Sequence, residues 1–286
     1  KLNLVLASQS DLPDVFLSWG ITNAQQITYG SQGVFLPLND LIDKYGYATK
    51  QVFDYNSLIK KAVTAPDGKI YGLPAINECY HCTFARKMWI NQKWLDNLGL
   101  AAPTTTDEFY NVLKAFKEKD PNKNGKKDEV PLAKASWEGN IDYFLMNAFI
   151  YNQGGNRLIV ENDKIIQAPV QPEWKEGLQY LRKLYAEGLM DPEIFLMDDN
   201  KTKLLTGSQD GNRVGACAGG SLAFVDQSTP VKEEFVALAP LTGPKGVGYA
   251  YQGTLGMGSG NFVITNKCKD PEVAFRFGDS IYQEYL

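Results

Sequence analysis

The residues from Asp120 to Glu129, DPNKNGKKDE, carry the clearest chemical pattern in the sequence. Oxygen-bearing side chains fall at the first, third, fifth and ninth positions, with Gly125 at the sixth, as in the first part of an EF-hand calcium loop. The pattern fails at the twelfth position, which is Pro131 rather than a glutamate, so we expect Glu129 to bend in instead. The expected calcium ligands are Asp120, Asn122, Asn124, Lys126 (through its backbone carbonyl), Asp128 and Glu129.

The alternative for this stretch is an ordinary solvated turn after a helix. Asp, Asn, Gly and Lys are common turn residues whether or not a metal is bound. A closed loop of this kind offers no open coordination position for catalysis and can only tie down a helix end. We therefore expect a structural calcium ion, with the solvated turn kept as the competing interpretation.

The four cysteines are too few and too scattered to predict a disulfide framework. Cys79 and Cys82 flank His81 in a C-x-x-C pattern, which raises the possibility of a zinc or thiol-redox site. A zinc site needs a second pair of ligands, and a redox pair needs a helix N-terminus to lower the thiol pKa. The sequence around Cys79 reads as extended, so we expect buried, inert cysteines and a histidine near a hinge.

The elements around these residues are organised about the stretch 67–100. A tight Asp67-Gly68 turn leads into a strand at 70–73, which stops at Pro74 because proline cannot donate to a central ladder. The chain then runs on extended, with mixed polar and aromatic residues, until a helix begins near Asn91. A long extended run with polar residues in its middle suits a segment that leaves one domain and enters another.

The rest of the chain alternates between predicted helices and strands, which indicates an α/β protein. Thr105 and Glu108 form a capping box for a helix with one buried stripe. Further helices are expected at 141–153, at 172–187 and from Asp270 onward, and strands at 213–217, 235–238 and 261–265. The glycine-rich stretch 243–260 predicts a flexible connection, so we expect at least two crossings between two lobes, near 75–80 and 256–262.

Composition excludes some partners. Net charge is −4, with 29 basic and 33 acidic residues, so no basic field is available for a nucleic-acid backbone. The apolar share of 44% and charged share of 22% are ordinary for a globular protein. No stretch approaches the roughly 20 apolar residues of a spanning helix.

The stretch 67–100, with its YGLP and later WL…LGL, resembles the extracellular solute-binding proteins of ABC transporters, of the sugar-binding lipoprotein type related to maltose- and alginate-binding proteins. Residues 6–15, 120–132 and 260–266 carry the same resemblance in the same order. Alginate-binding relatives have a calcium loop with the spacing seen at 120–129. The resemblance implies an α/β, two-lobe, type II periplasmic-binding-protein-like fold whose lobes are joined by crossing segments. We expect lobe I at 1–76 plus 261–286, and lobe II, with the calcium loop, at 77–260.

The same resemblance implies the function. The chain is expected to be the extracellular substrate-binding component of an ABC importer, which binds an oligosaccharide between two lobes and delivers it to the permease. We expect a monomer on the surface of a Gram-positive bacterium, or in the periplasm of a Gram-negative one, held to the membrane only by a lipid anchor outside this chain. Because relatives start earlier and continue further, the chain is expected to be truncated at both ends.

Sugar sites combine aromatic faces with a few polar groups, and several such residues fall where loops or crossings should meet the cleft. Trp137 and Glu138, before a predicted helix, are the foremost candidates. Core or lobe-lobe packing is the alternative for every aromatic, Trp19 included. The expected ligand-binding residues are Trp19, Asn77, Glu78, Trp137, Glu138, Phe224 and Tyr251.

Two other functions stay open. A glycoside hydrolase needs two carboxylates on opposite sides of the sugar, and Glu78 and Glu138 are the candidate pair. Nothing around them signals a raised pKa, so we expect no enzyme. A receptor that reports ligand occupancy to a membrane sensor cannot be separated from a transport protein by sequence.

Overall fold

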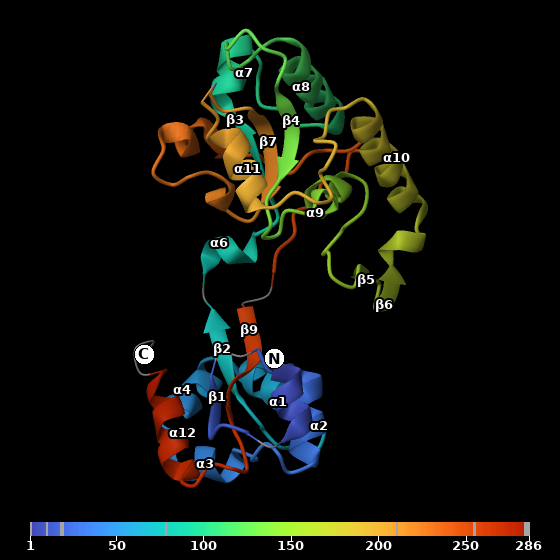
Figure 1. Ribbon diagram of the computed structural model, residues 1–286. Helices are drawn as coiled ribbons and strands as arrows, with labels where there is room; N and C mark the ends of the chain where they lie inside the picture. The colour runs from blue at the N-terminus through green and yellow to red at the C-terminus, as the bar shows by residue number, and fades with distance from the viewer. Residues whose placement is uncertain are drawn as a thin grey trace. The chain divides into compact units, whose positions relative to one another are not determined.

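The computed structural model describes residues 2–9, 11–17, 20–77, 79–209, 211–253 and 256–282 of the 286-residue chain. These residues fold into two compact units. Unit 1 combines Lys1–Cys79 with Thr254–Leu286, and unit 2 is the continuous stretch Tyr80–Gly253. Each unit has its own sheet, as the ribbon in Figure 1 shows. Each also has its own hydrophobic core.

Unit 1 is built on a three-stranded antiparallel sheet in the order β1-β9-β2. The central strand β9 (Gly256–Ile264) comes from the end of the chain and pairs with β1 (Val15–Leu17) and β2 (Leu73–Asn77) from its beginning. The strand predicted at 261–265 is confirmed as part of β9. Unit 1 therefore needs both ends of the sequence to complete its sheet.

Side chains of β9 alternate between two buried clusters. Phe262 and Ile264 pack into one cluster with Leu73 and Phe275, whereas Val263 packs into the other with Phe16. Successive strand residues point to opposite faces, so both faces of this sheet are covered. The covering helices are α1 (Leu2–Ser8), α2 (Asn23–Ser31), α3 (Asn39–Tyr45), α4 (Ala48–Tyr55), α5 (Ser57–Val63) and α12 (Pro271–Ser280).

Unit 2 contains a four-stranded mixed sheet in the order β4-β7-β3-β8. Strand β4 (Val130–Lys134) runs parallel to β7 (Val214–Gly219). Strand β3 (Lys87–Asn91) runs antiparallel to β7 and to β8 (Phe235–Ala237). The carboxyl ends of β4 and β7 and the start of β3 consequently meet at one edge of the sheet.

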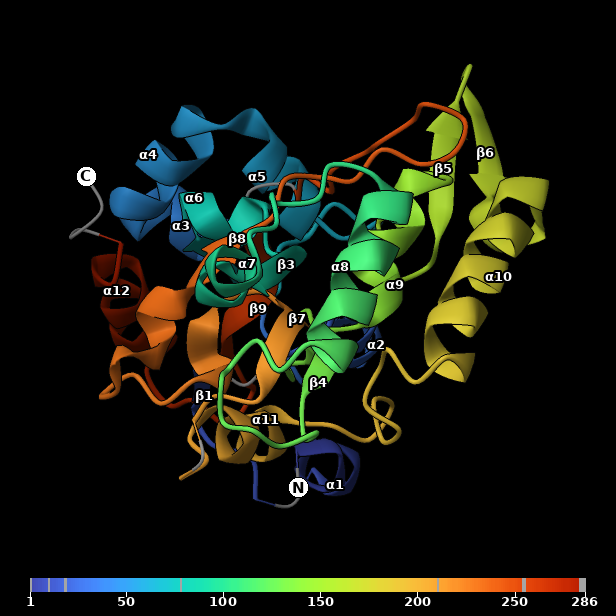
Figure 2. The same ribbon diagram turned by 90° about the horizontal axis from the view of Figure 1, so that it is seen from above.

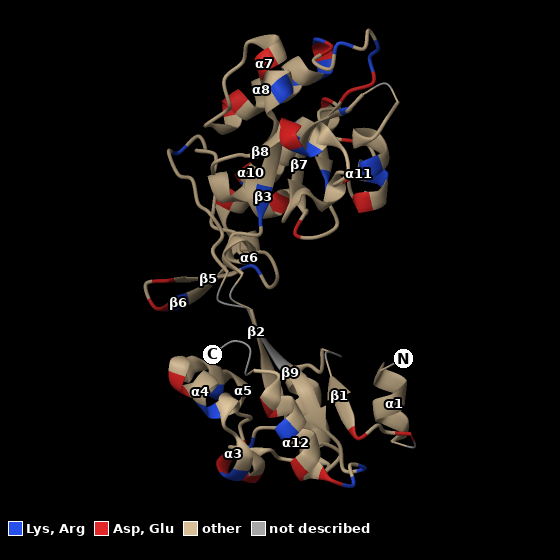
Figure 3. Cartoon of the chain, turned by 90° about the vertical axis from the view of Figure 1, so that its left-hand side faces the viewer, with Lys and Arg blue, Asp and Glu red and all other residues tan. Residues whose placement is uncertain are grey.

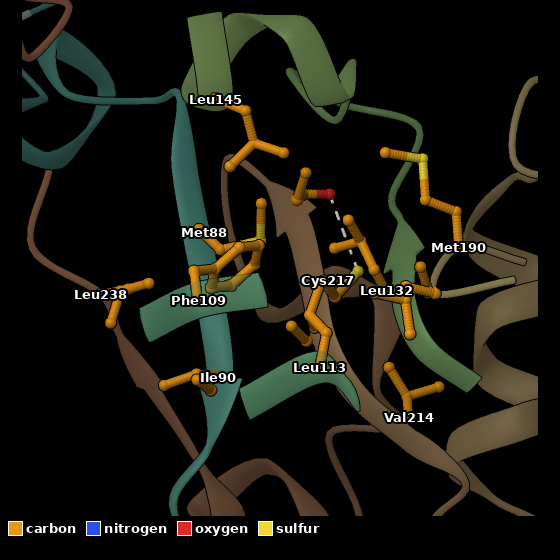
Figure 4. Close-up of a cluster of buried hydrophobic side chains, with 14 of the residues drawn as sticks. Met88, Ile90, Phe109, Leu113, Leu132, Leu145, Met190, Val214, Cys217 and Leu238 are labelled. Atoms are coloured by element: carbon orange, nitrogen blue, oxygen red, sulfur yellow. Dashed lines mark hydrogen bonds between the residues drawn. The ribbon is translucent and has the colours of Figure 1, made fainter. Parts of the chain in front are cut away.

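Strand β7 is buried along all six of its residues. Gly215 lies so close to helix α8 (Thr106–Glu118) that a Cβ there would come within 2.4 Å of the Phe116 ring and 2.9 Å of the Trp94 ring. Those two rings meet edge to face, with centroids 5.2 Å apart. Figure 4 shows the surrounding core, in which side chains from β3, β4, β7 and α8 (Thr106–Glu118) interdigitate. A glycine on β7 is therefore required by packing.

The remaining elements of unit 2 surround this sheet. Figures 1 and 2 both show the β5–β6 hairpin beyond the N-terminal end of α10. The helices are α6 (Tyr80–Thr83), α7 (Gln92–Leu98), α9 (Ile141–Leu145), α10 (Pro172–Ala186) and α11 (Asp199–Thr206), with 3₁₀ turns at Met146–Ala148, Ala168–Val170, Leu222–Phe224 and Pro230–Glu234 and the hairpin strands β5 (Leu158–Glu161) and β6 (Lys164–Gln167).

The helix predicted at 141–153 is wrong in its length. The α-helix ends at Leu145 and continues only as one 3₁₀ turn. Buried Asn147 donates from its side chain to the carbonyls of Tyr143 and Asn152, at 2.8 and 3.2 Å, and accepts the Asn152 N–H at 2.8 Å. Asparagine side chains that bond to the backbone in this way compete with the helix.

Other predicted helices match more closely. Helix α8 has the expected capping box between Thr105 and Glu108, and Phe109, Val112, Leu113 and Phe116 form its expected buried stripe. Helix α12 begins where predicted, with Asp270 at its N-cap. In α10, Trp174 and Leu184 are buried, whereas Leu178 is 49% exposed and is not a core residue.

Charged residues are mixed in sign. Figure 3 shows Lys and Arg interspersed with Asp and Glu along the helices of each unit. Among the described residues, no helix combines the length and the apolar character needed to cross a membrane.

A buried carboxylate holds helix α4 in unit 1. Asp279 on α12 is 4% exposed and accepts the backbone N–H groups that begin α4, at 3.1, 3.1 and 2.7 Å, from Tyr47, Ala48 and Thr49. These donors belong to a helix N-terminus, which lacks partners of its own and favours negative charge.

We expect Asp279→Ala to lower the free energy of unfolding of unit 1 by about 3 kcal/mol, because three N–H groups, two of them buried, lose their acceptor. Urea denaturation followed by fluorescence measures the change. Asp54→Ala, at an exposed position on α4, is the control and should change stability by no more than about 0.5 kcal/mol. Equal effects of the two substitutions would contradict the capping role.

Candidate functional site

Polar and aromatic residues gather in unit 2 at the edge where β4 and β7 end and β3 begins. The segment 135–139 follows β4, Gly220 follows β7, and Arg86 directly precedes β3. Lys87 is paired with Gly219 across the β3–β7 ladder, which fixes the common edge. In open α/β sheets, ligands bind beyond the carboxyl ends of the strands, so this edge is the candidate binding site of unit 2.

Trp137 presents an open aromatic surface at this edge. Its side chain is 43% exposed, although it is one of the largest apolar groups in the chain. One side of the indole lies against Gly220, where a Cβ would come within 2.4 Å of the ring, and the Gly220 N–H donates to the Trp137 carbonyl at 2.9 Å. The His81 ring meets the indole edge to face at a centroid distance of 6.3 Å. The backbone and His81 thus support the ring while part of it stays open to solvent.

The carboxylate of the next residue, Glu138, is held by an arginine whose side chain is largely covered. Arg86 Nε lies 2.8 Å from Glu138 Oε2, and the two side chains are 9% and 29% exposed. The guanidinium also stacks on two tyrosine rings, at 3.6 Å from the Tyr251 centroid and 4.6 Å from the Tyr143 centroid. A planar guanidinium suits such combined stacking and carboxylate pairing. Arg86 therefore connects Glu138 to two aromatic side chains from distant parts of the sequence.

Two features mark this pair as constrained. Glu138 has a φ of +52°, a left-handed conformation that non-glycine residues adopt rarely. Arg86 Nη1 is buried and has no hydrogen-bond partner among the described residues. Backbone strain of this kind persists only where the surrounding structure imposes it, and it often occurs at functional sites. The carboxylate is positioned by its neighbours and remains partly exposed.

This arrangement suits a neutral ligand better than a charged ligand at Glu138. Arg86 already neutralises the carboxylate, and the exposed indole offers an apolar surface next to a hydrogen-bond acceptor. A sugar presents the complementary groups, with apolar C–H faces and hydroxyl donors at the ring edge.

The other predicted site residues differ in their placement. Tyr251 joins Glu138 through Arg86, as described above. Asn77 is exposed in unit 1, where its side-chain oxygen accepts the Cys79 N–H at 2.9 Å. Trp19 and Glu78 lie outside the described residues.

Phe224 does not fit its predicted role. It is fully buried and meets Phe235 edge to face at 5.3 Å, so it is a core residue that a ligand cannot reach. Sequence reasoning also missed Arg86 and Tyr143. The one available signal was a cation directly before the buried strand β3, in the run Phe84-Ala85-Arg86-Lys87-Met88.

The prediction that Cys79 and Cys82 are buried, inert thiols is wrong. Cys79 and Cys82 are disulfide-bonded, and the stretch between them is not extended but enters the one-turn helix α6. That turn brings the two sulfurs and the His81 ring together, with Cys82 Sγ 3.9 Å from His81 Nε2. Cys217 is a free, fully buried thiol, and burial raises its pKa. The disulfide leaves no thiolate pair for zinc.

The loop 120–129 has the internal hydrogen bonding of a compact turn. The two carboxylate oxygens of Asp120 accept the N–H groups of Asn124 and Gly125, each at 3.0 Å. Asn124 donates from its side chain to Asp128 at 3.1 Å. Positive φ angles at Asp120, Lys123 and Gly125 (45°, 59° and 75°) fold these side chains toward the inside of the loop. Oxygen ligands from alternate positions are thus brought close together.

Glu129 provides the test of whether a cation fits. Its Oε1 is buried and has no hydrogen-bond partner among the described residues. Burial raises the pKa of its carboxyl, and the negative charges of Asp128 and Asp120 raise it further. Arg213 neutralises part of this charge by pairing with Asp128 at 3.1 Å. A buried acceptor without a donor, among like charges, fits a hard cation such as calcium.

These features can be compared with known proteins. The chain matches the family model described as bacterial extracellular solute-binding protein over residues 1–283. The chain belongs to this family. It is 34% identical over 299 residues to the fructooligosaccharide ABC transporter substrate-binding protein FusA of Streptococcus pneumoniae serotype 4, covering 99% of this chain and 53% of FusA. The predicted family is therefore confirmed, and the chain spans about half the length of this relative.

Solved structures agree with this assignment. FusA in complex with kestose has a TM-score of 0.85 and 34% identity, covering 98% of this chain and 57% of that one. A second FusA structure is described as an EF-hand mutant in complex with fructo-nystose. The alginate-binding protein AlgQ2 without calcium ion has a TM-score of 0.78 and 29% identity, covering 98% of this chain and 57% of that one.

The predicted fold class is also confirmed. A maltose-bound MalE3 of T. maritima shares the fold at 18% identity and a TM-score of 0.60, over 97% of this chain and 64% of that one. The chain thus has the two-lobe α/β fold of type II periplasmic binding proteins. The family and these relatives are solute-binding proteins rather than enzymes, in agreement with the prediction that this chain is not a hydrolase.

We expect Glu129→Gln to stabilise the chain in the presence of a chelator at neutral pH, by about 1 kcal/mol or less. Glu129 has a raised pKa in the folded chain, so its proton is held over a pH window in which the unfolded chain has lost it. The free energy of unfolding of the unsubstituted chain must therefore fall as the pH rises above about 4.3, the ordinary pKa of a glutamate, toward the raised pKa of the folded chain. The glutamine variant should lack this contribution. Urea unfolding of both chains from pH 4 to 8 measures the difference, and parallel pH profiles would contradict the expectation.

Proposed function

We propose that this chain is the substrate-binding component of an ABC importer that binds an oligosaccharide and delivers it to the permease. One observation carries the proposal: the Trp137 ring is exposed, and Arg86 holds the carboxylate of the next residue, Glu138, in place. Trp137 would stack on the apolar face of a sugar ring, and Glu138 would accept hydrogen bonds from its hydroxyls. FusA, which binds kestose, supports a carbohydrate ligand.

In this proposal the chain has two lobes, lobe I at 1–76 plus 261–286 and lobe II at 77–260, which close on the ligand by a hinge motion. Tyr251 takes part by stacking on Arg86, and Asn77 remains a candidate contact. The protein would act as a monomer outside the cell, as a lipoprotein of a Gram-positive bacterium. The family description as extracellular supports this location.

Isothermal titration with kestose, a maltooligosaccharide and a galacturonan fragment tests the binding, followed by chromatography of the recovered sugar. Recovery of an unchanged sugar after saturable binding is the expected result. Shortened products would overturn the proposal in favour of a hydrolase, and no binding to any sugar of a wider glycan array would overturn the carbohydrate ligand.

Trp137→Ala is expected to weaken binding of the best sugar in that panel about thirtyfold or more. Central tryptophans in binding sites commonly contribute 2 kcal/mol or more, and 1.4 kcal/mol corresponds to a factor of ten. Tyr47→Ala removes another exposed ring, 67% accessible and in unit 1, and should leave the affinity unchanged. An unchanged affinity in the Trp137 variant would remove the indole from the site.

We further propose that the loop 120–129 binds a structural calcium ion. The residues that would hold it are Asp120, Asn122, Asn124, Lys126 through its carbonyl, Asp128 and Glu129. The buried, unpartnered oxygen of Glu129 supports this set, as does the EF-hand reported for FusA. When bound, the ion would neutralise three carboxylates and tie the end of α8 to β4.

Calcium at about one hundred times its dissociation constant should stabilise the chain by roughly 2.7 kcal/mol. Asp120→Ala removes the first ligand and should abolish the shift, whereas Asp54→Asn, an exposed carboxylate on α4, should leave it intact. Thermal unfolding with and without calcium measures both. No shift in the original chain would favour the solvated turn.

A further inference from the structure

A second cavity of unit 2 lies apart from the residues assigned to sugar binding. Its volume is about 500 Å³, and it is bounded by the end of β4, the start of α9, one side of α10 and the segment 190–195. Neither Trp137 nor Glu138 lines it. Figure 1 shows α9 and α10 facing each other beside β4. Pockets of 300–1,000 Å³ are the usual size for small-molecule sites.

The charged groups of this cavity are mainly cationic. Lys134, Arg157 and Arg182 line it, and Asp142 is the one carboxylate that lines it in the described part of the chain. Asp142 is already used, because its Oδ2 lies 3.2 Å from Arg157 Nη2. In the described part of the chain, the side chains of Lys134 and Arg182 have neither an ion pair nor a hydrogen bond. The cavity therefore has two cations in excess.

This excess contrasts with other cations near the same elements. Lys201 pairs with Asp191 at 3.5 Å, and Lys245 pairs with Glu173 and Glu176 at 3.3 and 2.9 Å. The carboxylates adjoining α10 are thus matched to lysines outside the cavity. Arg157 Nε is buried without a hydrogen-bond partner among the described residues, which leaves a further donor unused.

The remaining wall of the cavity is apolar and aromatic. Leu178, which is 49% exposed, and Leu181 contribute aliphatic surface, and buried Met190 and Ile194 lie behind them. The Arg157 guanidinium lies 5.4 Å above the Trp174 ring. Phe195 is 80% exposed and stands next to the Tyr185 ring, with centroids 5.9 Å apart. An apolar wall beside unpaired cations suits an anion whose carbon skeleton has an apolar face.

We propose that this cavity binds a carboxylate attached to a six-membered ring, the chemistry presented by a hexuronic acid. The carboxylate would lie between Lys134 and Arg182, and the ring would lie on the aliphatic wall. Arginine favours planar carboxylates because its N–H groups match their two oxygens. A dianionic phosphate is a poorer match, since the apolar wall offers it no hydrogen bonds in place of water. This site is independent of the sugar site proposed above.

Calorimetric titration of the chain with galacturonate, with neutral galactose and with cyclohexanecarboxylate tests the assignment. Galacturonate should bind saturably and at least about tenfold more tightly than galactose, since a charge-assisted hydrogen bond contributes that much. Cyclohexanecarboxylate, which has a ring and a carboxylate but no hydroxyl groups, tests whether the cavity requires a sugar ring. Binding of both acids identifies a general ring carboxylate, and binding of galacturonate alone identifies a uronic acid; both results support the site.

Arg182→Gln and Lys134→Gln should each weaken galacturonate binding about tenfold. Lys175→Gln makes the same change of charge on the exposed side of α10, away from the cavity, and should have no effect. Trp137→Ala should also leave this binding intact while it weakens sugar binding, which separates the two sites. Equal affinities for galacturonate and galactose, or affinities unchanged in both glutamine variants, would overturn the proposal. Thermal unfolding of each variant verifies that it is folded.

Discussion

The burial of β7 along its whole length is the constraint on which unit 2 depends. A strand covered on both faces and paired on both sides can carry only small or apolar side chains, and this one reads VGACAG. Polar groups are displaced to its ends. Because β4 runs parallel to β7 and β3 runs antiparallel to it, three chain segments deliver their first or last exposed residues to the same edge. The position of the candidate site thus follows from the packing of the core.

At that edge, Arg86 determines the local geometry. A buried cation without a partner would be costly, so it requires an anion, and Glu138 provides it. The rings of Tyr143 and Tyr251 stack on the guanidinium and leave its side chain only 9% exposed. The result is a carboxylate fixed in direction beside an exposed indole. Such preorganisation reduces the entropy lost when a ligand binds.

Local patterns in the sequence predicted local structure well. The Thr105 capping box, the cap at Asp270 and the buried stripe of α8 depend on residues a few positions apart, and the structure confirms them. Interactions between distant residues could not be predicted. Arg86 meets partners at 138, 143 and 251, and the short α9 results from side-chain bonds of Asn147 to residues on both sides. Phe224 was wrongly predicted to contact the ligand, because the sequence beside a glycine-rich loop is the same whether an aromatic side chain points into the core or toward solvent.

The placement of β9 in the middle of the unit 1 sheet has a consequence for synthesis on the ribosome. Val15 pairs with Ile264, and most of the chain separates the two residues in sequence. The pair can form only after Ile264 has been synthesised. Unit 2 is uninterrupted from Tyr80 to Gly253 and contains every strand of its own sheets. Domains generally fold as units while translation proceeds at about 5–20 residues per second. Unit 2, the middle part of the sequence, is therefore complete first. The amino-terminal helices end at Val63 and β9 starts at Gly256, so these helices stay without their central strand for roughly 10–40 seconds of synthesis.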